Sequence, residues 1–85
     1  MPIVCSFAGI VVAMFYNDHN PPHFHARYGG RTVLIEIQAL RVYRGSLPAR
    51  QLDQVLNWAA SRQGPLMRNW ESARRGQPIS RLDPP

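Results

Sequence analysis

The feature that most constrains the fold is a glycine pair, Gly29-Gly30, between two short runs of β-branched and aromatic residues. The runs are HFHARY before the pair and RTVLIEI after it. Two glycines in this setting predict a β-hairpin with a two-residue type I′ turn, because that turn requires positive φ at both central positions. The turn sets the strand register, so Tyr28 is expected to pair with Arg31.

Other apolar runs predict further strands. IVCSFA and IVVAMFY flank Gly9, which suits a turn between two strands, and LRVYRG after the hairpin predicts a last short strand. Alternation along the hairpin places Phe24 and Ala26 on one apolar face of the sheet. That face is expected to meet whatever covers the sheet.

Residues 46–76 predict two helices. Pro48 suits a first helical turn, and apolar residues then recur at positions i, i+3, i+4 and i+7 from Leu52. The pair Gly64-Pro65 is expected to end this helix and begin a second one, which carries its own apolar stripe.

The chain is therefore predicted to be one α+β domain over residues 1–78. Its strands, within 1–45, form a four- or five-stranded antiparallel meander, and its two C-terminal helices, within 46–76, pack on one face of that sheet. Residues 79–85 are polar and rich in proline, which predicts a loosely ordered tail.

Composition narrows the setting and the partners. The net charge is +5, and all ten basic residues are arginine, which binds phosphate and carboxylate groups in planar, bidentate geometry. RNA, DNA or an acidic protein is the expected partner, although a solvated basic surface explains the charge equally well.

The single cysteine, Cys5, makes no internal disulfide and fits a reducing cytoplasm. The apolar N-terminal run lacks a basic segment and is too short for a bilayer, so no membrane association is expected.

All three histidines lie within NDHNPPHFHARYGG, residues 17–30. The hairpin register places His23, His25 and Arg27 together on the face opposite the apolar one. On the partner strand, Glu36 is expected directly opposite His23, with side chains roughly 5 Å apart.

Three hypotheses for these side chains remain open. In the first, His19, His23 and His25 bind a divalent metal such as zinc together with an acidic residue, since zinc accepts imidazole and carboxylate ligands. In the second, the histidines are the general acid and base of metal-free RNA cleavage, and Arg27 holds the phosphate. In the third, the histidines and Asp18 only hydrogen-bond the loop to the sheet.

Several segments together resemble one bacterial family, called domain of unknown function 4160. They are MP-I-V, NDHNPPHFH, YGG, GSLPARQLDQVLNWA and NWE-A-R-G, from Met1 to about Pro78. The resemblance implies a small cytoplasmic protein, often encoded beside a protein of the family domain of unknown function 2442. That pairing resembles a type II toxin–antitoxin module with this family as the toxin. The family's signature positions fall on Asp18, His19, Pro21, Pro22, His23 and His25.

The leading expectation is therefore a toxin-like component acting on RNA or on the translation apparatus. The candidate catalytic residues are Asp18, His19, His23, His25 and Glu36. The candidate phosphate-binding or nucleic-acid-binding residues are Arg27, Tyr28 and Arg31. The expected partner is a small acidic antitoxin-like protein of the 2442 type. The alternatives are a non-enzymatic module that docks a partner through a sheet edge and the histidine-rich loop, and a metal-binding protein; self-association through exposed strand edges also remains open.

Overall fold

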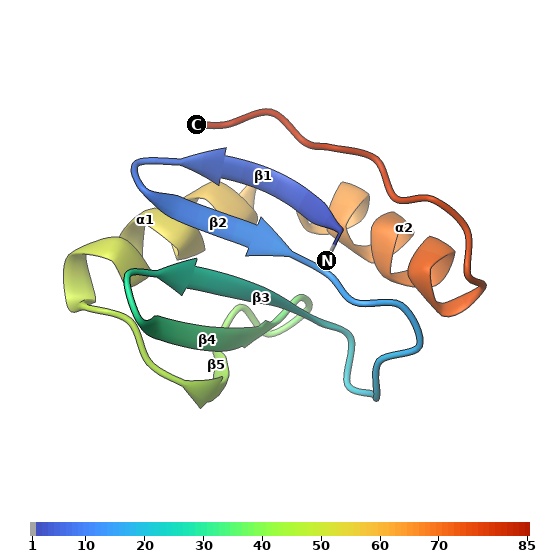
Figure 1. Cartoon of the computed structure of the whole chain (residues 1–85), viewed down its shortest axis with the longest axis horizontal. Coiled ribbons are helices and arrows are strands. Elements are labelled where there is room, and N and C mark those ends of the chain that lie inside the picture. The colour runs from blue at the N-terminus through green and yellow to red at the C-terminus, as the bar shows by residue number, and fades with distance from the viewer. Residues whose placement is uncertain (1) are drawn as a thin grey trace.

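The structure, a computed structural model, describes residues 2–85 and contains one sheet and two helices (Figure 1). The elements are β1 (Ile3–Phe7), β2 (Ile10–Ala13), β3 (His23–Tyr28), β4 (Arg31–Glu36), β5 (Val42–Gly45), α1 (Ala49–Ala60) and α2 (Gln63–Arg74). The strands pair antiparallel in the order β1-β2-β3-β4-β5, which is a simple meander. The predicted α+β class is confirmed, with five strands. Met1, the first residue of the predicted domain, lies outside the described residues.

The β3–β4 hairpin has the predicted register. Tyr28 pairs with Arg31 across a two-residue loop. The turn differs from the prediction in one respect, because Gly29 has a φ of 59° and Gly30 has no positive φ. Positive φ at the first central residue alone is typical of a type II′ turn, which suits the twist of a hairpin as well as type I′ does.

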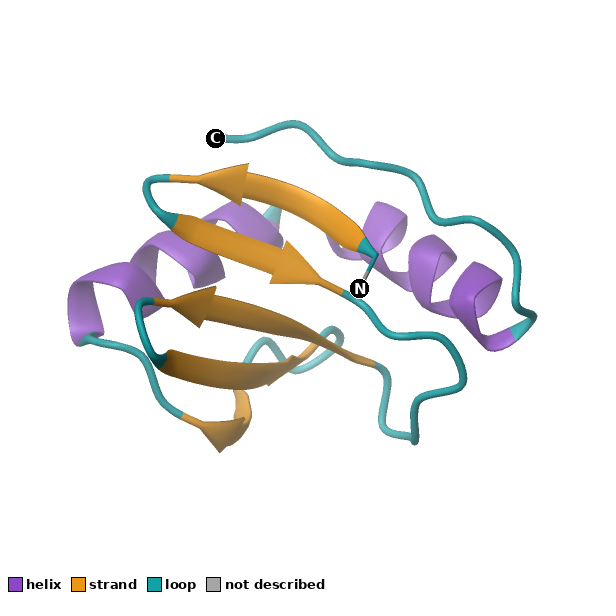
Figure 2. Cartoon of the chain, viewed as in Figure 1, coloured by secondary structure: helices purple, strands orange, loops and turns teal. Residues whose placement is uncertain are grey.

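The apolar core lies between the sheet and the helices. Phe24 and Ala26 on β3, and Val33 and Ile35 on β4, are completely buried on the face predicted to be covered. Figure 2 shows both helices behind the sheet. They contribute Val55, Trp58, Ala59, Leu66 and Trp70 to the same core. The opposite face of the sheet lies away from the helices, except at His23, whose ring packs against Trp70 of α2, and we call it the open face.

The helix boundary lies a few residues earlier than the sequence predicted. Helix α1 ends at Ala60 and α2 begins at Gln63, so Gly64 and Pro65 belong to the first turn of α2 rather than to the break. Proline is tolerated there because the first amides of a helix have no intrahelical partner. Within residues 2–85, neither helix is long and apolar enough to cross a membrane.

Residues 79–85 run past the outer edge of β1 (Figure 1). Leu82 donates a backbone hydrogen bond of 2.8 Å to the carbonyl of Val4, and the indole of Trp58 donates one of 2.8 Å to the carbonyl of Asp83. The composition of this segment predicted a loose tail. These contacts depend on single backbone groups, which composition does not reveal.

Candidate functional site

Asp18 brings two histidines together at the start of β3. It lies in the loop that joins β2 to β3, whereas His23 and His25 are alternate residues of β3. Its Oδ2 atom lies 3.1 Å from Nε2 of His23 and 3.2 Å from Nε2 of His25. One ligand atom from each residue falls within 4.8 Å of the others. We call these three residues the histidine–aspartate cluster.

His23 is the buried member, with 3% of its side chain exposed. Its Nδ1 lies 2.7 Å from the backbone carbonyl of Pro21. Because a carbonyl only accepts hydrogen bonds, Nδ1 carries a proton and donates it. The ring packs 5.2 Å from Trp70 of α2 and 5.7 Å from Tyr43 of β5, measured between ring centroids. The backbone and two aromatic rings thus fix the direction of Nε2.

The Nε2 atom of His23 has no hydrogen-bond partner, although it is buried. Asp18 is close enough at 3.1 Å, but it lies outside the angular range of a hydrogen bond from this ring nitrogen. A buried polar atom without a partner costs about 1–3 kcal/mol. The 3.1 Å approach of the Asp18 carboxylate is therefore the one polar contact of this atom within residues 2–85.

His25 is the accessible histidine, with 17% of its side chain exposed. Its Nε2 makes the hydrogen bond to Asp18, and the ring of Phe15 meets it edge-on at 4.4 Å between centroids. Burial lowers the pKa of His25 below its usual value, and the opposing attraction of Asp18 does not fully compensate. His25 is thus held mainly neutral at neutral pH.

Asp18 is the acceptor that joins the cluster. Burial raises the pKa of its carboxyl, but the hydrogen bonds from the His25 ring and the His19 amide, with the nearby imidazoles, outweigh burial. The resulting pKa lies below the usual range, so Asp18 is ionised at neutral pH. The His19 amide donates to Oδ1 over 2.9 Å, which leaves Oδ2 to the two histidines.

A small cavity of about 150 Å³ adjoins the cluster. Its lining residues are Asp18, His19, His23, Leu34, Tyr43 and Arg44. In the strand register His25 pairs with Leu34, and Leu34 pairs with Arg44, so these three form one row across β3, β4 and β5. The row supplies an arginine to the cavity, which suits an anionic ligand.

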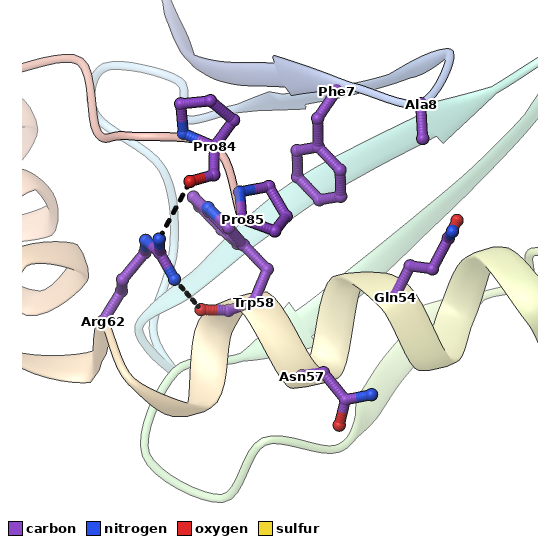
Figure 3. Close-up of a pocket in the computed structure, with 8 residues that line it drawn as sticks. All are labelled: Phe7, Ala8, Gln54, Asn57, Trp58, Arg62, Pro84 and Pro85. Atoms are coloured by element: carbon purple, nitrogen blue, oxygen red, sulfur yellow. Dashed lines mark hydrogen bonds between the residues drawn. The ribbon is translucent and has the colours of Figure 1, made fainter.

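A larger cavity, of about 480 Å³, lies at the other end of the molecule between the β1–β2 turn, α1 and the tail. Figure 3 shows its lining, in which Arg62 is the one charged side chain. That guanidinium already donates to the carbonyls of Trp58 and Pro84. This cavity is therefore the larger of the two, but its lining has few groups that could take part in a reaction. The smaller cavity is lined by titratable side chains.

The cluster contains three of the five predicted catalytic residues. The predicted pairing of Glu36 with His23 is present in the register. The carboxylate of Glu36, however, accepts a 2.8 Å hydrogen bond from Arg41. The side chain of His19 is exposed, and the residue reaches the cluster through its backbone amide.

The predicted phosphate-binding residues separate in the structure. Arg27 is exposed and lies one position along the open face from His25. Tyr28 packs against the core, and Arg31 donates to the hydroxyl of Ser46 at the far end of the hairpin. The sequence analysis did not identify Arg44 as a candidate residue. Its position beside Leu34 depends on an irregularity in the β4–β5 register, which no sequence pattern indicates.

One comparison with known proteins gives a result. A family model described as Domain of unknown function (DUF4160) matches residues 9–71, which include the whole cluster and both helices up to Glu71. This confirms the family expected from the sequence motifs. No curated protein and no solved structure matches the chain.

Proposed function

The chain belongs to the DUF4160 family, and we propose that it is the toxin-like component of a bacterial toxin–antitoxin module and cleaves RNA at the histidine–aspartate cluster. One observation carries the proposal. Two imidazoles converge on a single ionised carboxylate oxygen, beside a cavity that Arg44 lines. Convergent groups of this kind in a concave site are the usual signature of proton-transfer chemistry.

The proposed reaction needs no external reagent. The 2′-hydroxyl of a ribose loses its proton to the cluster, and its oxygen forms a bond to the adjacent phosphorus. The bond from phosphorus to the 5′-oxygen breaks, and that oxygen leaves with a proton. The products are a 2′,3′-cyclic phosphate and a free 5′-hydroxyl, so atoms and charges balance.

Two arginines on the open face suit the phosphate backbone of the substrate. Arg27 is two residues along β3 from His25, about 7 Å away, and Arg44 is two strands away, about 10 Å. These are distances between backbone positions, and arginines at such positions suit an anionic polymer that crosses the sheet over His25. The overall charge of +5 favours the approach of such a polymer.

Induced expression in a bacterial host tests the proposal directly. We expect growth arrest and loss of intact RNA with the wild type, and neither with His25→Ala or Asp18→Asn. Asp53→Asn is the matched control for Asp18→Asn, because it makes the same chemical change on the exposed surface of α1. Arrest that survives His25→Ala and Asp18→Asn, or arrest with intact RNA, contradicts the proposal.

The expected partner is an acidic antitoxin-like protein of the domain of unknown function 2442 type, which would cover the open face. Strand β5 supports a docking role, since it is an edge strand with all four residues exposed. Val42 and Tyr43 are 41% and 45% exposed, and such a strand edge readily accepts another strand. Co-expression should suppress growth arrest and give a stable complex, and failure of both would contradict this part of the proposal.

A further inference from the structure

We propose that the histidine–aspartate cluster is a mononuclear site for a divalent transition-metal ion of the zinc class, with Nε2 of His23, Nε2 of His25 and Oδ2 of Asp18 as its ligands. The site stands on geometry alone, whereas its use in RNA cleavage rests on the proposed function. It differs from the set that the sequence suggested, which was the three histidines with an acidic residue, because Asp18 is the acidic ligand and His19 is not a ligand.

The tautomer of His23 provides the first argument. Its Nδ1 donates to the Pro21 carbonyl at 2.7 Å, so the neutral ring has a lone pair on Nε2. That lone pair meets a carboxylate oxygen at 3.1 Å, and two electron-rich atoms at this distance repel each other unless a positive species lies between them. The positive species is either a second proton or a metal ion.

The angle at His23 favours the metal ion. A proton on Nε2 lies in the ring plane and needs its acceptor nearly in line with it, and Asp18 does not meet that condition. A metal ion on the same lone pair requires only that Oδ2 approach the ion from another direction. The arrangement that fails as a hydrogen bond is therefore suitable for coordination.

The distances agree with a single ion. Ligand atoms about 2.1 Å from one ion, and about 90–110° apart around it, lie roughly 3.0–3.4 Å from each other. The two nitrogen–oxygen separations in the cluster are 3.1 and 3.2 Å. A cation would also satisfy the buried Nε2 atom of His23, which has no other partner.

The surroundings of His23 resemble those of a metal-bound imidazole. Such a ring usually donates its other N–H to a carboxylate or a backbone carbonyl, which fixes the tautomer and orients the ligand atom. The Pro21 carbonyl has this role. The rings of Trp70 and Tyr43 then limit rotation of the imidazole.

The ligand set indicates the class of ion and an open position on it. Two imidazoles and one carboxylate suit zinc and its neighbours better than magnesium or calcium, which prefer oxygen ligands alone. Three protein ligands would leave at least one coordination position open to water. A water molecule bound there would have a pKa near neutrality and would take the proton of the 2′-hydroxyl, the step assigned above to the cluster, while Arg44 lines the adjacent cavity.

Zinc titration of protein prepared without a histidine tag, followed by isothermal calorimetry, tests the site without any RNA. We expect one Zn²⁺ per chain for the wild type, and affinity at least about 100-fold weaker for His25→Ala and for Asp18→Asn. Loss of an outer partner of a ligand alone costs about 10–100-fold, so loss of a ligand should cost at least that much. His19→Ala should bind zinc like the wild type.

Cobalt gives a second readout that does not depend on affinity. Co²⁺ bound to the wild type and to His19→Ala should give the same visible absorption bands, and His25→Ala should lose them. Circular dichroism of the variants establishes that they are folded. The proposed site is wrong if the wild type binds no zinc or binds more than one ion per chain. It is also wrong if His25→Ala still binds zinc, or if His19→Ala does not.

The two proposals fail in different ways. Zinc binding without any toxicity contradicts the RNA-cleaving function and leaves the metal site intact. Histidine-dependent toxicity in protein that binds no zinc contradicts the metal site and leaves the function intact.

Discussion

The two faces of the sheet are built by different forces. On the helix side, alternate residues of β3 and β4 are apolar and completely buried, and they contact α1 and α2. On the open side, the same strand carries His23 and His25, which contact a loop carboxylate, and His23 also contacts one carbonyl and the ring of Trp70. The first face contributes stability through apolar burial. The second gathers titratable groups, and it places the buried Nε2 atom of His23 3.1 Å from the Asp18 carboxylate without a hydrogen bond between them.

Adjacent residues of β3 give the sharpest test of this difference. Phe24 is 0% exposed on the helix side, and Phe24→Ala should lower the free energy of unfolding by about 3–5 kcal/mol, because it leaves a cavity in the core. His25→Ala, one residue along on the open side, should cost less than about 1 kcal/mol. Urea denaturation followed by circular dichroism measures both. Equal losses would show that the cluster is part of the structural core.

Gly45 at the end of β5 tests whether the edge strand depends on its backbone conformation. Its φ is 79°, and a Cβ atom there would collide with the carbonyl oxygen of Thr32. Gly45→Ala should therefore destabilise the fold by about 2–4 kcal/mol, from strain and crowding together.

Gly30→Ala is the matched control for Gly45→Ala. Gly30 has no positive φ, and nothing lies within 4 Å of the position its Cβ would occupy. Its substitution should change the midpoint of thermal unfolding very little. If both variants unfold at the wild-type midpoint, the edge strand tolerates rearrangement and the backbone argument is wrong.

The helix side could be predicted from the sequence because its information is local and periodic. The glycine pair set the register, and alternation then identified Phe24 and Ala26 as buried. The same register placed His23 and His25 together. The exact helix boundary and the turn type were wrong, since both depend on backbone angles that more than one local sequence satisfies.

The open side could be predicted only in part. The sequence predicted that His23 pairs with Glu36, and the strand register agrees. The carboxylate of Glu36, however, accepts a hydrogen bond from Arg41 and not from His23. Asp18, from the loop between β2 and β3, contacts both histidines instead. The Pro21 carbonyl lies two residues from His23, so this contact is local, whereas Trp70 comes from α2 and no spacing rule places it beside His23.

Residues 79–85 contact the helix side of the molecule, and a substitution that frees them should lower the free energy of unfolding less than a substitution in the core. Asn69 of α2 is 4% exposed, and its side chain donates to the carbonyl of Ser80 and accepts from its amide, over 2.8 and 2.9 Å. Asn69→Ala removes both hydrogen bonds and should cost about 1–3 kcal/mol. Trypsin should also cleave after Arg81 faster than in the wild type.

The control for Asn69→Ala is Asn57→Ala, since Asn57 is exposed on α1. It should leave the rate of cleavage after Arg81 and the unfolding midpoint almost unchanged. Unchanged trypsin cleavage in Asn69→Ala would mean that the backbone contacts of the tail hold it without this side chain.

The smallest effect concerns a titratable group on the packed side, Cys5 of β1. Burial raises the pKa of its thiol above the usual 9.0, and a backbone hydrogen bond at Ser6, with the nearby arginines, opposes this only in part. The folded state therefore disfavours the thiolate, so the contribution of Cys5 to stability is complete below about pH 9 and is lost as pH rises through the raised pKa. Unfolding free energies at pH 8 and pH 10 should fall more for the wild type than for Cys5→Ala. Equal decreases in the two proteins would mean that the folded state accommodates the thiolate of Cys5. The packed face at β1 would then not differ from the open face in how it treats a charged group.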